Sequence, residues 1–295
     1  MNLFKLRECL TQFFIEDFGD GDLTSQSIFS KTELAEGLFT AKADGVFSGS
    51  EVLKEGFSLG SPGILVEALV QDGDSITKGQ DLFFVKGPVY ELLGRERVLL
   101  NLIQRMSGIA TLTHQAVKLL NSNHTKICDT RKTVPGLRML DKYAVTCGGG
   151  TNHRFGLYDG VMIKDNHIEH MGSITAAVQA AREKLGHMVK IEVETETKEQ
   201  VIEAVRAKAD VIMFDNRTPE EIKEFVKLVP SPIVTEASGG IVLDTLSKFS
   251  DTGVDFISLG VLTHSVKALD ISFNLTKGSD YNGTSRHFST SQPIA

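Results

Sequence analysis

The chain has 295 residues, of which 41% are hydrophobic and 23% are charged, a composition typical of globular proteins. Its formal net charge of −7 argues against a general nucleic-acid binder, because positive charge would dominate the surface of such a protein. Three cysteines, Cys9, Cys128 and Cys147, are too few and too scattered for a disulfide framework or a zinc site, and they fit a reducing compartment.

The first 22 residues have apolar side chains spaced as on one face of a helix and interrupted by charges. They lack the continuous apolar run and the small-residue cleavage site of a signal peptide. No apolar run in the chain approaches the roughly 18 residues needed to span a bilayer. We therefore expect a cytoplasmic protein without a membrane partner.

Residues 1–112 indicate a small α+β domain. Two β-prone segments, 38–49 and 63–87, contain Gly/Asp turns, and a long helical pattern follows over 89–120. We expect this helix to be broken near Ser107 and Gly108.

The last part of the chain contains one more strand pattern. Leu269, Ile271, Phe273 and Leu275 alternate with polar residues, as in a half-buried strand. We expect the segment 268–277 to pair back with the first domain. The tail over 278–295 is rich in Ser, Gly and Thr, and we expect it to fray.

Between these parts, residues 113–267 alternate short apolar runs with amphipathic helical patterns. Such alternation is typical of parallel βαβ units, and six in succession predict a full or partial (β/α) barrel. The predicted strands are 126–130, 160–166, 190–196, 210–216, 232–240 and 255–260. One of the intervening helices should begin at Thr218, since "TPEE" supplies an N-cap, a first-turn proline and acidic residues at the positive end of the helix dipole.

Reactive residues follow directly after the apolar part of each strand. In a parallel barrel all carboxyl ends of the strands lie on one face, where active sites are built. Each residue alone could be a solvated loop residue, but all of them together favour a site. The residues are Asp129, Arg131, Lys164, Asp165, Glu194, Asp215, Ser238, Gly239, Gly240 and Gly260.

The stretch "TRKTVPGLRMLDKYAVTCGGGTNHR", residues 130–154, gathers positive charge in an acidic protein. Arginine and lysine here match carboxylates or phosphates, so the stretch predicts a subsite for a small ligand with several negative groups. The three glycines at 148–150 permit close approach of backbone or ligand. Lys142 lies in a helical pattern, and we expect it on a solvated face; for Arg138 the same alternative stays open. His153 could be structural or functional.

Glu194 and Asp215 end consecutive strands and should lie side by side. Paired carboxylates opposite a cationic cluster fit Mg²⁺ held partly through water and substrate phosphates, although an ion-paired set without metal is an equal alternative. "SGG" at 238–240 and "SLG" at 258–260 end the last two strands, where barrel loops commonly form a phosphate site.

The block "TRKTVPGLRMLDKYAVTCGGGTNHRFGLYDGVMIKDNHI" closely resembles the core signature of the quinolinate phosphoribosyltransferase family, also described as carboxylating nicotinate-nucleotide pyrophosphorylases. The segments "EDFGDGDLTS", "ERVLLNLIQRMSGIAT", "IEVET", "MFDN", "EASGGI" and "SLGVLTHS" also look like family blocks in family order. The resemblance covers almost the whole chain except the tail beyond residue 277. It implies a small N-terminal α+β sandwich domain followed by an incomplete α/β barrel.

The resemblance also implies a reaction and its site. Quinolinate and phosphoribosyl pyrophosphate would give nicotinate mononucleotide, pyrophosphate and CO₂ in de novo NAD synthesis, with Mg²⁺ as cofactor, in a homo-oligomer with shared active sites. Arg105 would reach the site from the partner chain. By the resemblance, the quinolinate carboxylates would be held by Arg105, Arg131, His153, Arg154 and Lys164; pyrophosphate would lie near Lys132; the ribose and Mg²⁺ would face Glu194 and Asp215; and the 5′-phosphate would bind Ser238, Gly239, Gly240 and Gly260, with His264 nearby.

Two rival functions stay open at this point. One is a paralogue on the same scaffold that uses another acidic or pyridine substrate, such as the molybdenum-associated relative. The other is a non-catalytic anion-binding or scaffolding protein that kept the barrel. The retained cationic set and the retained carboxylate pair favour the quinolinate enzyme. We see no nucleophile, and we expect Cys147 to be a packing residue.

Overall fold

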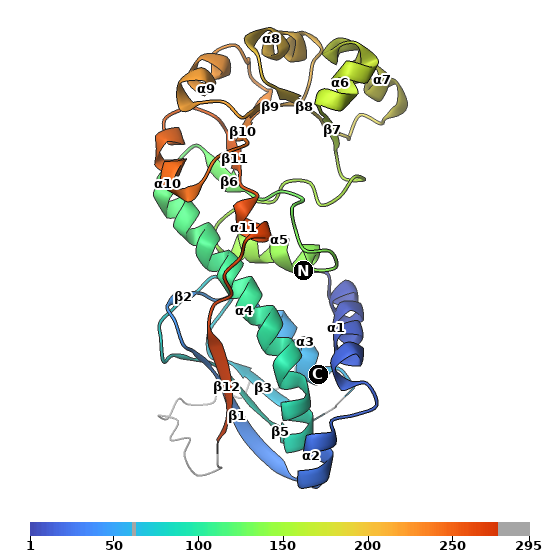
Figure 1. Ribbon diagram of the computed structural model, residues 1–295, viewed down its shortest axis with the longest axis vertical. Coiled ribbons are helices and arrows are strands. Elements are labelled where there is room, and N and C mark those ends of the chain that lie inside the picture. Colours follow the sequence, from blue (N-terminus) through green and yellow to red (C-terminus); the bar gives the residue numbers. More distant parts are fainter. Residues whose placement is uncertain (61–62, 277–295) are drawn as a thin grey trace, which may run out of the picture.

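The computed structural model describes residues 1–60 and 63–276, so the predicted tail at 278–295 lies outside the described residues. The molecule is elongated, with an antiparallel sheet at one end and a parallel sheet at the other (Figure 1). The helices and strands of the first part are α1 (Leu3–Phe18), α2 (Leu23–Ile28), β1 (Leu34–Ala41), β2 (Gly45–Val46), α3 (Ser50–Ser58), β3 (Leu65–Ala68), β4 (Ser75–Ile76), β5 (Asp81–Pro88) and α4 (Val89–Leu120).

The rest of the described chain forms the parallel sheet, its covering helices and a returning strand. These elements are β6 (Lys126–Cys128), α5 (Arg138–Cys147), β7 (Val161–Ile163), α6 (Asp165–Met171), α7 (Ile174–Lys184), β8 (Ile191–Thr195), α8 (Lys198–Arg206), β9 (Val211–Asp215), α9 (Pro219–Val226), β10 (Val234–Ser238), α10 (Leu243–Leu246), η1 (Ser247–Phe249), β11 (Phe256–Ser258), α11 (Val261–His264) and β12 (Ile271–Thr276).

The N-terminal domain is built on a sheet of order β12-β1-β5-β3. Strand β12 pairs antiparallel with β1, with Phe39 opposite Phe273, so the chain returns to this domain after the barrel. The two rings lie 4.7 Å apart, and Gly37 makes room for Phe273, whose ring atoms would come within 2.4 Å of an added Cβ. Aromatic burial on this scale is a large part of what holds a small sheet domain together.

Helix α4 connects the two halves without interruption. The predicted break near Ser107 and Gly108 is wrong. The two small residues do not form a turn; they allow other segments to pack closely against the helix. Ser107 Oγ bonds the backbone of Ser48, and a Cβ on Gly108 would lie 2.3 Å from the carbonyl oxygen of Lys267. The small side chains let other segments reach the helix backbone. The domain limits at residues 112 and 267 remain our proposal, since α4 runs through the first of them.

The six strands predicted for the barrel are all present and parallel, in the order β6-β11-β10-β9-β8-β7. Within the described residues, β6 and β7 do not pair with each other; a bridge joins Cys128 to Thr151 instead. The barrel is therefore incomplete, as predicted, and Figure 1 shows its strands as an arc with α6 to α9 on the outside.

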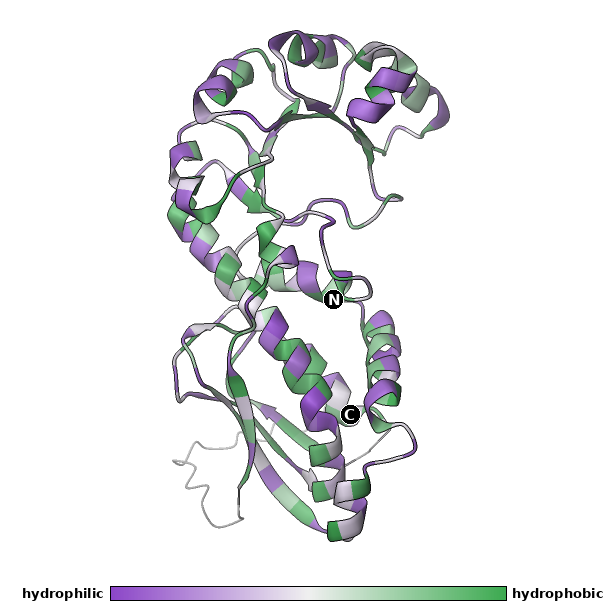
Figure 2. Ribbon diagram, in the orientation of Figure 1, coloured by the Kyte–Doolittle hydropathy of each residue, from purple (hydrophilic) through white to green (hydrophobic). Residues whose placement is uncertain are grey.

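The two faces of the parallel strands differ in chemistry. Alternate residues such as Val193 and Phe214 are fully buried under the outer helices, while Glu192 and Glu194 lie on the opposite face of β8. Helices α8 and α9 direct apolar residues at the sheet and hydrophilic residues outward (Figure 2). Thr218 caps α9 as predicted, its side chain accepting from the backbone N–H of Glu221 at 3.3 Å. The glutamates of β8 therefore face the inside of the arc.

In the part of the chain that the structure describes, no helix combines the length and the apolar character that crossing a membrane requires.

Candidate active site

The glycines at 148–150 serve close packing of helix α5 against α4. A Cβ on Gly148 would lie 2.3 Å from the carbonyl oxygen of Ala110, and one on Gly150 would lie 2.8 Å from Thr113. Gly149 has φ +88, which favours glycine. The chain can therefore turn sharply after α5 and enter the mouth of the barrel with His153 and Arg154.

A buried network fixes this entering segment. Lys142 has no exposed surface, and its ammonium group pairs with Asp129 and donates to the carbonyl oxygen of His153 at 2.9 Å. Asp129 also accepts from the backbone N–H of His153 at 2.9 Å and from Asn152 Nδ2 at 2.6 Å. The expectation that Lys142 lies on a solvated helix face is wrong: the helical period is correct, but the face carrying Lys142 is turned toward the end of β6.

Arg138, whose role the sequence leaves open, holds the loops on either side of α5. Its Nε donates to Thr133 Oγ1 at 3.1 Å, and its Nη1 donates to the carbonyl oxygen of Phe155 at 3.1 Å. These bonds tie the loop after β6 to the segment after Arg154.

Arg131 and Arg154 form the positive part of the site. Arg131 Nε is buried and has no hydrogen-bond partner among the described residues, although buried polar groups are normally paired. Burial, together with the nearby charge of Arg131, lowers the pKa of Arg154, whose Nη1 donates to the carbonyl oxygen of Gly160 at 2.7 Å. Two guanidinium groups in this arrangement favour a ligand that brings negative charge.

His153 connects the mouth to two glutamates deeper in the barrel. Its Nε2 lies 3.0 Å from Glu192 Oε2 and 3.6 Å from Glu236 Oε2, and both glutamates are buried, with exposed fractions of 5% and 4%. Burial alone would lower the pKa of His153, but the hydrogen bond with Glu192 and the charges of both glutamates outweigh it and raise that pKa. Burial and the neighbouring Glu192 raise the pKa of Glu236 to about 7.

The same three residues have the composition of a metal site, with one ligand atom from each within 4.8 Å of the others. However, His153 Nδ1 accepts from the backbone N–H of Arg154 at 2.7 Å, which leaves the proton on Nε2 facing Glu192. A metal-bound histidine needs the reverse, with its second nitrogen donating outward. We therefore interpret the group as a hydrogen-bonded triad.

Lys164, Glu194 and Asp215 occupy the ends of three successive strands. Lys164 Nζ pairs with Glu194 Oε1, and β8 and β9 are neighbours in the sheet. Burial raises the pKa of Glu194 despite Lys164, and it raises the pKa of Asp215, with Glu196 adding to the effect. The positive charge nearby does not offset the burial of these two carboxylates. This fits a divalent cation held by one or two carboxylates together with ligand oxygens.

The ends of the last two strands lie between Asp215 and Lys132. Gly239 and Gly240 have φ values of +80 and +65, and a Cβ on Gly239 would lie 2.3 Å from Asn216 Oδ1 and 2.7 Å from Asp215 Oδ1. An added Cβ on Gly260 would lie 2.9 Å from the Lys132 side chain and 3.1 Å from the ring of His264. Ser238 and Ser258 share a hydrogen bond of 2.8 Å. The predicted phosphate residues thus border the carboxylate pair on one side and Lys132 on the other.

Arg105 lies on α4, apart from the strand-end residues in sequence and in its contacts. Its Nε and Nη2 bind both carboxylate oxygens of the buried Asp141 at 2.8 Å, and Nη2 also donates to the carbonyl oxygen of Thr263 at 2.9 Å. Within its own chain Arg105 therefore joins α4 to α5 and α11, and its contact with substrate stays a prediction.

Sequence reasoning missed Glu192 and Glu236 and misplaced Lys142. A signal for the glutamates existed, because Glu192 precedes Glu194 by two residues and Glu236 precedes Ser238 by two. A period of two places each pair on the same face of its strand, here the inside of the barrel. Cys147 accepts a hydrogen bond from Ser48 Oγ at 3.3 Å, and burial raises its pKa, so its thiol is not an activated nucleophile.

Known proteins match this chain over almost its whole length. Residues 22–107 match the sequence profile described as quinolinate phosphoribosyl transferase, N-terminal domain, and residues 109–274 match the C-terminal domain of the same family. The chain belongs to the quinolinate phosphoribosyltransferase family.

Individual relatives agree with this assignment. A probable nicotinate-nucleotide pyrophosphorylase [carboxylating] of Bacillus subtilis is 57% identical, over 94% of this chain and 95% of the relative. A mitochondrial quinolinate phosphoribosyltransferase [decarboxylating] 2b of Nicotiana tabacum is 40% identical, over 92% of this chain and 82% of the relative. The crystal structure of NadC from Streptococcus pyogenes superposes with a TM-score of 0.90 at 38% identity, covering 94% of this chain and 98% of that one.

Proposed function

We propose that this enzyme transfers the phosphoribosyl group of phosphoribosyl pyrophosphate to quinolinate, with loss of CO₂, giving nicotinate mononucleotide and pyrophosphate for NAD synthesis. The observation that carries the proposal is the pair Arg131 and Arg154, with an unpartnered buried Nε, beside carboxylates of raised pKa. The part of the site around Arg131 and Arg154 lacks a negative group, and the part around Glu194 and Asp215 lacks a positive one. A dicarboxylate pyridine and a phosphorylated sugar that becomes positive during the reaction supply both.

Quinolinate lies, in this proposal, with its carboxylates on Arg131, Arg154 and Lys164. His153, expected from the sequence to join them, borders this set, because its two ring nitrogens are engaged by Glu192 and by the backbone N–H of Arg154. Arginine forks bind carboxylates through two parallel hydrogen bonds, which orients the flat ring as well as holding it. The ring nitrogen is then directed at C1′ of the ribose, held over Glu194 and Asp215. Ser238, Gly239, Gly240 and Gly260 receive the 5′-phosphate, with His264 next to them.

The residues present fit a divalent cation, because Glu194 and Asp215 are neighbouring, half-buried carboxylates with too little compensating positive charge. Mg²⁺ would be held there through water and the substrate phosphates, and it would supply electrostatic stabilisation of the departing pyrophosphate. Lys132, beside Gly260, adds positive charge at the same end.

The chemistry follows from the charges that develop on the substrates. As the bond from C1′ to pyrophosphate breaks, the ribose becomes oxocarbenium-like, and the carboxylates of Glu194 and Asp215 favour that positive charge, as in glycoside hydrolysis. The pyridine nitrogen forms the new bond to C1′ and becomes cationic. The cationic ring nitrogen then stabilises the electron pair left on the adjacent ring carbon when its carboxylate leaves as CO₂, and that carbon takes up a proton from water.

We further propose that the enzyme works as a homo-oligomer, a dimer or an assembly of dimers, in which Arg105 contributes to the partner's site. We also place it in the cytoplasm, in keeping with the free thiols of Cys9, Cys128 and Cys147.

The test is to incubate the protein with quinolinate, phosphoribosyl pyrophosphate and Mg²⁺ and to follow nicotinate mononucleotide. In parallel, nicotinate replaces quinolinate. We expect product from quinolinate and very little from nicotinate, since nicotinate leaves part of the buried cationic set unpaired. Comparable turnover of the two acids would contradict the specificity, and absence of product from both would contradict the reaction.

A further inference from the structure

The buried Lys142–Asp129 pair lies directly behind the segment that carries His153 and Arg154. Neither residue has any exposed side-chain surface, so neither can touch a substrate in the mouth of the barrel. Lys142 nevertheless makes close contacts on three sides: with Asp129, with the carbonyl oxygen of His153 at 2.9 Å, and with the ring of Phe155, whose centroid lies 5.1 Å from Nζ.

The pair holds the peptide backbone of His153 at both of its polar groups. Asp129 Oδ1 accepts from the N–H of His153 at 2.9 Å, while Lys142 donates to its carbonyl oxygen. Asn152 is held in addition, since its Nδ2 donates to Asp129 Oδ2 at 2.6 Å and to the carbonyl oxygen of Lys142 at 2.8 Å. A backbone fixed in this way leaves the directions of the His153 and Arg154 side chains little freedom.

Stability alone does not account for such a pair. Taking two charges out of water costs several kcal/mol per ion, and well-packed apolar residues of similar volume often serve a core equally well or better. What the charges provide here is direction, because an ammonium and a carboxylate bind carbonyl and N–H groups at defined positions.

We propose that Lys142 and Asp129 are positioning residues of the phosphoribosyl transfer, which set the quinolinate-carboxylate subsite by clamping the backbone of His153. This inference rests on the proposed function, in particular on the assignment of the His153–Arg154 segment to the quinolinate subsite. The clamp acts mainly on quinolinate, since the residues proposed for the ribose and the 5′-phosphate follow other strands than β6.

The test uses a double variant, because Lys142→Met alone would leave Asp129 buried without its cation and destabilise the fold. In Asp129→Asn/Lys142→Met both charges are gone, and the amide introduced at position 129 still offers one oxygen to the His153 N–H. We expect KM for quinolinate to rise about 10- to 100-fold, as for a misplaced binding group, with KM for phosphoribosyl pyrophosphate changed less than about twofold.

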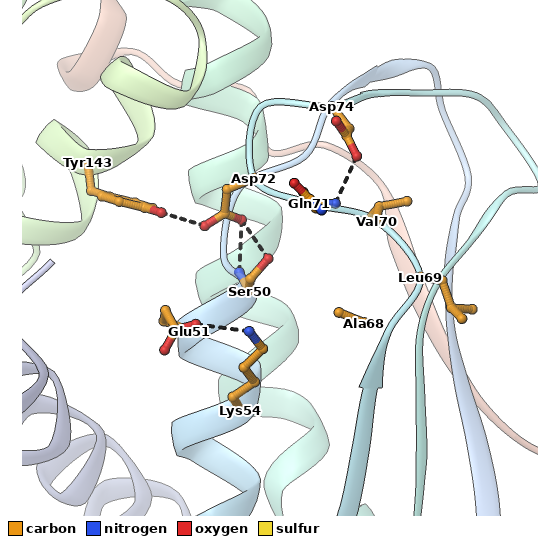
Figure 3. Close-up of a pocket in the computed structure, with 10 residues that line it drawn as sticks. All are labelled: Ser50, Glu51, Lys54, Ala68, Leu69, Val70, Gln71, Asp72, Asp74 and Tyr143. Atoms are coloured by element: carbon orange, nitrogen blue, oxygen red, sulfur yellow. Dashed lines mark hydrogen bonds and ion pairs between the residues drawn. The ribbon is translucent and has the colours of Figure 1, made fainter. Parts of the chain in front are cut away.

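Tyr143→Phe is the matched control, on the next residue of the same helix. Tyr143 Oη donates to Asp72 Oδ2 at 2.7 Å, and Asp72 in turn holds the start of α3, which docks α5 on the N-terminal domain (Figure 3). Losing this bond should lower the melting temperature and leave KM for quinolinate unchanged.

The outcomes separate the clamp from a purely structural role. A folded double variant with a normal KM for quinolinate would overturn the proposal, and so would a Tyr143→Phe variant with an equal rise in KM. A general loss of folded protein would change the amount of active enzyme, and hence the apparent kcat, without selecting one substrate. Failure of the proposed function itself would be distinguishable, because the unaltered protein would then form no nicotinate mononucleotide.

Discussion

The N-terminal domain and the barrel mouth use charged side chains in different ways. In the N-terminal domain Asp72 accepts from two backbone N–H groups, a serine hydroxyl and Tyr143, and Glu55 takes both nitrogens of the Arg7 fork. In the barrel Arg131 Nε, Glu192 Oε1 and Glu236 Oε1 are buried without partners among the described residues. Arg95 Nε on α4 is also without a partner, but the other nitrogens of Arg95 bind Glu91 and the carbonyl oxygen of Leu59. At the site Lys164 pairs with Glu194, whereas Arg131 Nε is left for a ligand to complete.

The largest effect on activity should follow removal of a positively charged side chain from the site. Arg131→Ala should lower kcat/KM about 10²- to 10³-fold, since a carboxylate of quinolinate would lose its charged partner. Lys164→Ala should have an effect of similar size. Neither should lower the melting temperature much, because both residues follow strand ends rather than fill the core.

The matched control is Lys86→Ala in the N-terminal domain, which removes the exposed ion pair with Glu36 at 2.8 Å and should leave kcat/KM unchanged. A near-normal kcat/KM in either site variant would show that its residue does not bind substrate.

Removal of the divalent cation should have the next largest effect on activity. In excess chelator we expect turnover to fall at least about 100-fold and to return when Mg²⁺ is restored, because pyrophosphate would leave without that stabilisation. Glu194→Gln/Asp215→Asn should weaken the response to Mg²⁺ concentration in the same assay. Full turnover in chelator would show that the two carboxylates act without metal.

How much the sequence alone can predict depends on whether a feature follows from local pattern or from contacts between residues distant in sequence. The six strands, the open barrel and the strand-end position of the cationic and acidic residues follow from period and order along the chain. Lys142 could not be placed, because a helical period does not reveal which side of a helix meets the core. The continuous helix at Ser107 and Gly108 could not be predicted for a related reason: the close approach of Lys267 depends on contacts distant in sequence. Tertiary packing, which overrides local pattern, decides such positions.

In our proposal Arg105 pairs with Asp141 in its own chain and also binds substrate in the partner's site. A subunit-mixing experiment tests the second role. Arg105→Ala and Lys164→Ala should each be nearly inactive alone. In an equal mixture, about half of the dimers would be mixed, and each mixed dimer would have one site with both residues intact, so about a quarter of the normal activity should return.

Asp141→Asn is the control for Arg105, since it disturbs the ion pair within the chain and keeps the arginine. If Asp141→Asn is as inactive as Arg105→Ala and the mixture of Arg105→Ala with Lys164→Ala recovers nothing despite demonstrated subunit exchange, then Arg105 acts within its own chain.

The smallest expected effect is a dependence of stability on pH that originates at Glu236. Its pKa lies near 7 in the folded protein, compared with 4.5 for an ordinary glutamate, so between these values the folded state binds more protons than the unfolded state. This part of the free energy of unfolding must therefore fall as pH rises from about 4.5 to 7. The raised pKa of His153 acts in the same direction, since its stabilisation is lost as the imidazolium deprotonates.

Glu236→Gln should remove most of this dependence while keeping the size of the side chain. Relative to the unaltered protein, its free energy of unfolding, measured with urea, should become larger as pH rises from about 5 to about 8, by roughly 1–3 kcal/mol. Taking the difference between the two proteins at each pH cancels the contribution of groups that do not interact with Glu236; the part of His153 that depends on Glu236 stays in the difference. If the difference for Glu236→Gln does not change with pH, then the Glu236 carboxylate is compensated in the folded protein, and the contrast between paired and unpaired charges does not extend into the barrel interior.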